Sequence, residues 1–194
     1  LVFRNDDVVI NGEDGDTVYP QIMLTNSHDG KNSFQFQAGL YRMICSNGLV
    51  IADEQFESVK MRHMGYSFED LQDMIKEMVG KLPLTVESMN KMKAIEMAEE
   101  QILAFAKDAL NARFTKKEMN RIEVDLKELT TPTRNEDKGS DLWSVFNVVQ
   151  EKLIEGDFQY RAGGKVRQAR VIKNFKQDMK INKKLFNVAL EYAA

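Results

Sequence analysis

The sequence predicts an α+β fold with an antiparallel N-terminal sheet, a helical middle, and a C-terminal basic β-hairpin followed by a helix. Apolar and polar residues alternate in much of the first third of the chain, which is typical of half-buried strands. At about Ser67 the apolar spacing changes to the period of about 3.6 residues that marks an amphipathic helix. After Gly156 the pattern is extended again, around the turn signal Gly163-Gly164.

Residues 1–66 are expected to form strands joined by tight turns. Asn-Gly and Asp-Gly pairs near the start separate two extended segments, which predicts a hairpin. Phe34 and Phe36 alternate with glutamines, as expected of a strand with one face in the core. Asn47-Gly48 permits the positive φ angles that a two-residue turn requires before the next apolar segment.

Residues 67–156 are expected to be mainly helical. Ser67 is a suitable N-cap for the first helix, and Pro83 is expected to end that helix because proline has no backbone N–H. A second helical stretch is predicted over 88–114, followed by a short helix over 116–128 that begins with a capping box.

Ser140 or Asp141 is expected to cap a further helix that ends at Gly156. Beside its ordinary core face, this helix has a second face on which two amides lie between apolar residues. That second face consists of Trp143, Asn147, Gln150 and Ile154. Buried amides need hydrogen-bond partners, so Asn147 and Gln150 are predicted to bind the backbone of a loop. A ligand-facing role is the alternative.

The C-terminal region is strongly basic although the chain has a net charge of −3. Between Asp157 and Lys184 there are nine basic and two acidic residues, which leaves this segment at +7 and the remainder at −10. An anionic partner is therefore expected, most simply nucleic acid. The candidate phosphate contacts are Arg161, Lys165, Arg167, Arg170, Lys173 and Lys176. Asn182 is expected to cap the terminal helix.

Length and composition favour a cytoplasmic protein. No linker divides the 194 residues, so we expect one domain over 1–194, comprising a β-rich part (1–66), a mainly helical part (67–156) and the basic hairpin with the terminal helix (157–194). The single cysteine fits a reducing compartment, and no apolar run has the ~20 residues of a membrane helix. The chain begins with Leu1 instead of methionine, and we expect an N-terminal part of the domain to precede it.

Three separated blocks and two later motifs resemble the phage- and plasmid-associated family of unknown function numbered nine-three-two. They are Ser27-His28-Asp29-Gly30, Cys45-Ser46-Asn47-Gly48-Leu49, Arg62-His63-Met64-Gly65, Leu142-Trp143 with Asn147 and Gln150-Glu151, and Lys180-Ile181-Asn182. The resemblance implies a protein encoded in prophages, conjugative elements or plasmids, without an assigned activity. It marks His28, Asp29, Asn47, Arg62, His63, Trp143, Asn147 and Gln150 as candidate site residues.

Three functions compete at this point. The favoured one is a non-enzymatic accessory of DNA replication or recombination that binds single-stranded or duplex nucleic acid. In it the basic hairpin neutralises phosphates, and Tyr160 or Phe158 stacks on bases. A basic hairpin is also often only a solvated strand pair.

The second function is a metal-dependent enzyme, in which His28 and His63 would meet a carboxylate from Asp29, Asp53 or Glu54. Both histidines equally suit hydrogen bonds within their own turns. The third is nucleophilic catalysis by Cys45, which more often is a small buried apolar residue. No phosphate-binding glycine loop followed by Lys-Ser or Lys-Thr occurs, and no cofactor is expected.

Overall fold

The computed structural model describes residues 2–4, 10–11, 17–25, 34–42, 48–50, 59–61 and 68–194. The chain divides into two compact units, Leu1–Glu87 and Ser88–Ala194, and each is described by itself. Helices and antiparallel strands are both present, so the predicted α+β class is confirmed. The expected organisation as a single domain stays a prediction.

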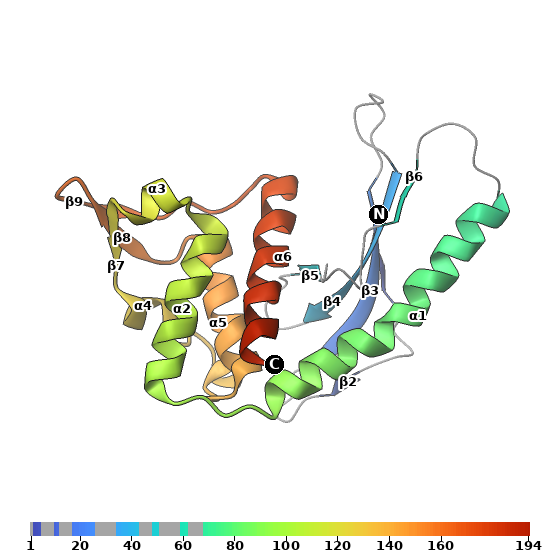
Figure 1. The fold of residues 1–194 in the computed structure, drawn as a ribbon, viewed down its shortest axis with the longest axis horizontal. Helices are drawn as coiled ribbons and strands as arrows, with labels where there is room; N and C mark the ends of the chain where they lie inside the picture. Colours follow the sequence, from blue (N-terminus) through green and yellow to red (C-terminus); the bar gives the residue numbers. More distant parts are fainter. Residues whose placement is uncertain are drawn as a thin grey trace. The chain divides into compact units, whose positions relative to one another are not determined.

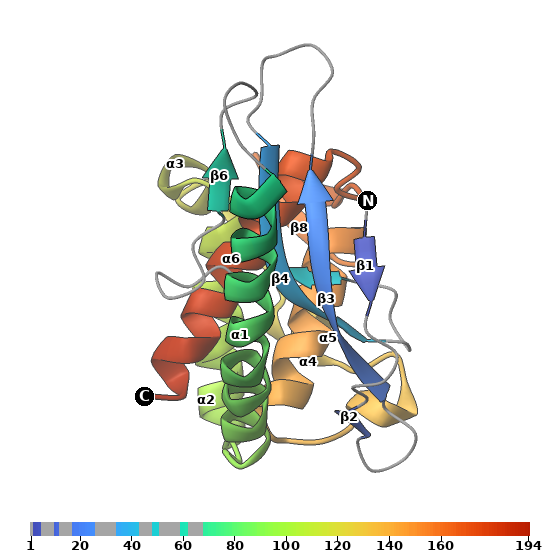
Figure 2. The ribbon, with the colours of Figure 1, turned by 90° about the vertical axis from the view of Figure 1, so that its right-hand side faces the viewer.

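The described strands of the first unit form one antiparallel sheet. Strands β3 and β4 make its longest pair, with Val18 opposite Arg42 and Thr25 opposite Gln35. β1 and β2 pair with β3, whereas β5 and β6 pair with β4. Figure 2 shows β1, β3 and β4 as neighbouring arrows. The strands are β1 (Val2–Arg4), β2 (Ile10–Asn11), β3 (Thr17–Thr25), β4 (Phe34–Arg42), β5 (Gly48–Val50) and β6 (Val59–Met61).

Helix α1 (Phe68–Lys93) continues through Pro83, so the prediction that this proline ends the helix is wrong. Acidic residues in its first turn and lysines in its last turn complement the helix dipole. The chain leaves the helical conformation at 94–98 instead. There Met97 N donates to Ser140 O at 2.9 Å and Leu142 N donates to Ile95 O at 2.9 Å. This short antiparallel contact supplies the hydrogen bonds that continuing the helix would have formed.

Three helices pack together in the second unit, as Figure 1 shows. They are α2 (Glu99–Arg113), α5 (Leu142–Glu155) and α6 (Phe175–Tyr192). Phe105, Phe146 and Phe186, one from each helix, are at most 1% exposed. Burying an aromatic side chain of this size contributes about 2–3 kcal/mol, so these rings supply much of the stability of this core.

The segment between α2 and α5 contains a strand that the sequence pattern did not indicate. The capping box of Thr115 with Glu118 is present, but α3 (Lys116–Met119) is followed by β7 (Ile122–Val124) and then by α4 (Leu126–Thr130). The predicted helix over 116–128 is therefore wrong beyond its first turn. Pairing with β8 (Gln159–Ala162), which is distant in sequence, makes residues 122–124 extended.

The caps of the last two long helices differ in how well the sequence predicted them. Asp141 caps α5 by accepting a hydrogen bond from Ser144 N, and Gly156 ends it with φ +74°, both as predicted. Helix α6 begins earlier than predicted, because the side chain of Asn174 accepts a hydrogen bond from Gln177 N at 3.0 Å. Asn182 lies buried inside α6 and is not its cap.

Candidate nucleic-acid interface

The hairpin β8–β9 is the basic hairpin that the sequence predicted. β8 pairs with β9 (Lys165–Gln168) on one side and with β7 on the other, all antiparallel. Gly163 and Gly164 connect β8 to β9 with φ angles of +57° and +75°, values that glycine adopts without strain. Figure 1 shows this hairpin at one end of the second unit.

The register of this sheet separates its side chains onto two faces, because directly opposite residues in antiparallel strands point to the same side. Tyr160 is opposite Arg167 and Val124, and these three residues define the arginine face. Arg161 is opposite Val166 and Glu123, and these three define the acidic face. Arg161 and Arg167, both candidate phosphate contacts, therefore lie on opposite faces.

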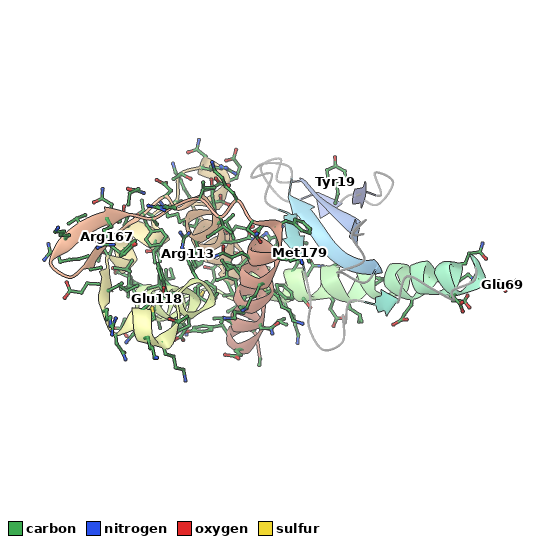
Figure 3. All side chains as sticks on the ribbon, turned by 90° about the horizontal axis from the view of Figure 1, so that it is seen from above. Tyr19, Glu69, Arg113, Glu118, Arg167 and Met179 are labelled. Atoms are coloured by element: carbon green, nitrogen blue, oxygen red, sulfur yellow. The ribbon has the colours of Figure 1, made fainter. Side chains whose placement is uncertain are left out.

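A cavity of about 430 Å³, which we call the arginine cavity, opens beside the arginine face. Helix α2 contributes Arg113 from its last turn, and the hairpin contributes Tyr160 and Arg167. Arg113 and Arg167 are labelled in Figure 3. None of the described residues that line it is acidic. The lining residues are Arg113, Phe114, Tyr160, Arg167, Gln168, Ala169 and Arg170.

The guanidinium of Arg113 fixes the inner wall of this cavity. It donates hydrogen bonds to the backbone oxygen of Leu153, near the end of α5, and to that of Arg170 at 2.5 Å. It also lies over the rings of Phe114 and Phe158, 5.7 and 5.4 Å from their centroids. Burial lowers the pKa of Arg113, whereas its electrostatic interaction with Tyr160 raises it. Arg113 thus ties α2, α5 and the segment after β9 together.

A second set of backbone contacts holds the segment that carries Arg170. Ile172 N donates to Ile154 O at 2.8 Å, and Ala169 N donates to Phe158 O at 3.0 Å. The side-chain amide of Gln168 donates to the backbone oxygens of Gly156 and Phe158, at 2.7 and 3.1 Å. These hydrogen bonds hold the outer wall of the arginine cavity in place.

Arg167 and Arg170 are the accessible cations of the cavity. Both residues are exposed. Among the described residues, no carboxylate forms an ion pair with either of them. An unpaired guanidinium retains its donors for a phosphate, which it binds in a bidentate geometry.

The other candidate phosphate contacts lie outside the lining of this cavity. Lys165 lies on the side of the arginine face, opposite Ala162 at the hairpin turn. Lys173 precedes α6 and Lys176 lies in its first turn, and both residues are exposed. Arg161 is exposed on the acidic face. Their role in binding stays a prediction.

A second hollow, the acidic groove, lies along the acidic face with a volume of about 450 Å³. Two of its three carboxylates already have structural roles. Asp125 caps α4 by accepting from Lys127 N at 2.9 Å, and Glu128 accepts from Gln159 N at 3.1 Å. The lining residues are Glu123, Val124, Asp125, Glu128, Gln159, Tyr160, Arg161 and Val166. Phosphate binding is unfavourable here, because three carboxylates oppose one arginine.

The two rings proposed for base stacking have different environments. Phe158 is 0% exposed, so the expectation that it stacks on a base is wrong. Tyr160 is half-buried and lines the arginine cavity together with Phe114. The centroids of the Phe114 and Tyr160 rings are 5.7 Å apart, with the ring planes at 61°. These two rings form the aromatic part of the cavity lining.

Trp143, Asn147 and Gln150 are buried in α5, at 2%, 5% and 1% exposure. Asn147 donates to the backbone oxygen of Trp143 at 2.7 Å, within its own helix, and Gln150 donates to Asn182 Oδ1 at 2.7 Å. The expected partner, a loop backbone, is therefore wrong for both amides. None of the three side chains lines the arginine cavity.

The remaining family-motif candidates lie outside the described residues. They are His28, Asp29, Asn47, Arg62 and His63. Cys45 lies outside them as well, so the metal-site and cysteine hypotheses stay predictions. Within the part of the chain that the structure describes, no group of three or more His, Cys, Asp or Glu side chains converges as metal ligands do. In that same part, no helix combines the length and apolar character that crossing a bilayer requires.

Sequence reasoning missed Arg113 and Phe114 as members of the site. Their neighbours in sequence belong to an amphipathic helix that ends there, and a terminal arginine is common because it complements the helix dipole. Only the packing of the α2 terminus against the hairpin brings these two residues to the cavity. No local pattern in the sequence could have indicated this contact.

Fold and site together define an α+β protein whose second unit carries a cavity lined by arginine and aromatic side chains. The family model described as "Domain of unknown function (DUF932)" matches residues 3–186, and the chain belongs to this family. The resemblance seen in the sequence motifs is thereby confirmed.

Two curated relatives come from Escherichia coli (strain K12). The UPF0380 proteins YafZ and YfjQ are each 32% identical to this chain over 171 residues. The alignments cover 88% of this chain and 61% of each relative, so the chain spans less than two thirds of their length. No solved structure matches the chain.

Proposed function

We propose that this protein binds nucleic acid through the arginine cavity and the adjoining arginine face, as a non-enzymatic accessory in DNA replication or recombination. The observation that carries the proposal is the convergence of three arginines and two aromatic rings on one cavity. Arginine binds phosphate and aromatic rings stack on bases, and proteins that bind single strands combine the two.

The arrangement favours single-stranded over duplex nucleic acid. Tyr160 and Phe114 are half-buried in the walls of a cavity, where a stacked base pair has no access. Unpaired bases can turn out of the strand and reach such rings. Arg167 and Arg170 then contact the backbone phosphates beside the base.

The setting in a phage, plasmid or integrated mobile element is part of the proposal and rests on the sequence motifs. The names printed for the two E. coli relatives give no activity. The charge distribution adds physical support, because a segment of +7 in a chain of −3 concentrates attraction for a polyanion in the C-terminal region.

The test is a fluorescence-anisotropy titration of labelled single-stranded DNA, duplex DNA and RNA at several salt concentrations. We expect tight binding of the single strand, with affinity that falls linearly on a log–log plot against salt. Replacing both cavity arginines (R167Q/R170Q) removes two phosphate contacts. The magnitude of the salt slope should then fall by about 1.4, since each contact to a single strand contributes about 0.7.

A matched control separates the cavity from overall charge. The variant K107Q/R121Q removes the same charge from exposed positions of the same unit that neither line the arginine cavity nor belong to the candidate phosphate contacts. It should keep most of the affinity. Equal losses in the two double variants would show that only net charge matters, and absence of binding at low salt would refute the proposed function.

A further inference from the structure

The arginine cavity has the dimensions of a small-ligand site as well as the chemistry of a strand-binding surface. Its volume of about 430 Å³ lies in the range of roughly 300–1,000 Å³ that is usual for ligand pockets. We propose that it holds one unpaired nucleotide, with the base against Tyr160 and Phe114 and the phosphate between Arg167 and Arg170. This inference rests on the proposed function and names the unit that the site recognises.

The phosphate half of the site is prepared by backbone contacts. Arg170 belongs to a segment fixed by its own carbonyl, which accepts from Arg113 at 2.5 Å, and by the hydrogen bond from Ile172 N to Ile154 O. Arg167 is held by the ladder between β8 and β9. The guanidinium groups of Arg167 and Arg170 thus extend from backbone that is already ordered, and the charge of Arg113 lies behind them. A phosphate that binds here does not have to order this backbone, so less of its binding energy is lost.

The base half of the site is prepared by aromatic packing. Phe114 is held edge-to-face against the buried ring of Phe158, with the centroids 6.3 Å apart and the planes at 90°. Tyr160 is held in the central strand of the sheet. Because the planes of Phe114 and Tyr160 are inclined at 61°, a flat base stacks on one ring while its edge contacts the other.

Isothermal titration calorimetry with free ligands tests this inference directly. The probes are thymidine 5′-monophosphate, thymidine, inorganic phosphate and phosphotyrosine. We expect the nucleotide to bind more tightly than thymidine or phosphate alone, because only the nucleotide fills both halves. Equal affinity for inorganic phosphate would reduce the cavity to an anion site. Equal affinity for phosphotyrosine would indicate a phosphopeptide site, and either result overturns the inference.

Two substitutions at Tyr160 separate stacking from folding. Y160L keeps an apolar side chain but removes the ring, and it should raise the Kd for the nucleotide by roughly 5- to 150-fold, the range expected for one base stacked on one ring. Y160F keeps the ring and should bind like the wild type. Fluorescence of Trp143, the only tryptophan, shows that each variant folds. Should Y160L fail to fold, R167Q on the exposed strand carries the test, with R121Q as its control.

The outcomes distinguish this inference from the function on which it rests. Binding of single-stranded DNA that thymidine monophosphate neither competes for nor reproduces would refute the nucleotide site and leave the proposed function intact. Binding of the free nucleotide without any binding of the strand would refute the proposed function and leave the cavity as a site for a small nucleotide.

Discussion

Gly156 is the residue at which the end of α5 meets the backbone that carries Arg170. Its φ of +74° lies in the left-handed region. A Cβ at this position would lie 2.6 Å from the carbonyl carbon of Arg170 and 2.8 Å from its oxygen. Two separate constraints therefore require glycine here: the turn of the chain and the close approach of a second backbone segment.

The substitution G156A should destabilise the second unit by about 3 kcal/mol, because a left-handed alanine costs about 1–2 kcal/mol and the clash adds a similar amount. G163A is the matched control. Gly163 also has a positive φ, of +57°, but a Cβ added there meets no atom within 4 Å. The loss of stability in G163A should therefore stay near 1 kcal/mol. Urea unfolding followed by Trp143 fluorescence measures both changes. Equal losses would show that the contact with Arg170 is unimportant.

At the residue scale, the sequence indicated part of the candidate site. Charge density alone pointed to Arg167 and Arg170, because a basic segment in an acidic chain is visible without a structure. Alternation could not separate Tyr160 from Phe158, since two residues spaced by two lie on the same side of a strand. Phe158 is buried where the end of α2 packs against it, with Arg113 over its ring and Phe114 edge-to-face with it, and these are tertiary contacts.

Helices α5 and α6 are joined by a buried chain of side-chain hydrogen bonds. Gln150 donates to Asn182 Oδ1 at 2.7 Å, and Asn182 donates to Asp178 Oδ1 at 2.9 Å. Gln150 and Asn182 are 1% and 2% exposed. The Gln150 amide group and the Asn182 side-chain oxygen are therefore partners across the two helices, and this buried pair helps to fix how the helices align.

A double-mutant cycle should show this dependence. N182L leaves the Gln150 amide buried without its acceptor and should cost about 1–3 kcal/mol, and Q150L should cost a similar amount. The double variant Q150L/N182L should cost clearly less than the sum, because neither amide then remains buried without the other. Asp178 loses its donor Asn182 in N182L and in the double variant alike, so this loss does not enter the coupling. Unfolding free energies give the coupling, and additive losses would mean that the two amides do not depend on each other.

At the element scale, the sequence predicted the segments whose signals are local. The cap at Asp141, the end of α5 at Gly156 and the turn at Gly163-Gly164 all follow from neighbouring residues. The predictions were wrong where pairing with residues distant in the sequence decides the local conformation. Residues 122–124 become a strand only beside β8, and 94–98 leave the helix because they bind residues 140–142. Pro83 was misjudged for a different reason, since a long helix can accommodate the loss of one hydrogen bond.

Two carboxylates of the second unit have pKa values that folding shifts in opposite directions. Burial raises the pKa of Asp178, which Glu155 raises further and the hydrogen bond from Asn182 lowers. Hydrogen bonds from the backbone and side chain of Thr115 lower the pKa of Glu118. The folded state therefore holds the Asp178 proton more tightly than the unfolded state does, and the Glu118 proton less tightly.

The substitution D178N should stabilise the protein at pH 7, because it removes a charge that folding disfavours while the amide oxygen still accepts from Asn182. This advantage should shrink as the pH falls through the raised pKa of Asp178 and vanish below its ordinary value of 3.8. Trp143 fluorescence during urea unfolding at a series of pH values measures the difference. A difference that is independent of pH would contradict the assignment.

The substitution E118Q is the control of opposite sign. It should destabilise the protein at neutral pH, because it removes a carboxylate that two hydrogen bonds from Thr115 stabilise. The difference in stability between E118Q and the wild type should diminish as the pH falls through the lowered pKa of Glu118. At that pH the wild-type carboxylate is protonated and loses the same stabilisation. The two variants together separate local ionisation from a general effect of acid.

The three-stranded sheet bears its arginine face on one side and its acidic face on the other. Such a separation of charge across a thin layer is an electric dipole directed through the sheet. In the field of an approaching polyanion, this dipole experiences a torque that turns the arginine face forward before contact is made. If the protein binds nucleic acid as proposed, this torque would turn wrongly oriented molecules during their approach. On the proposed function, the acidic face would therefore aid recognition of nucleic acid without contacting it.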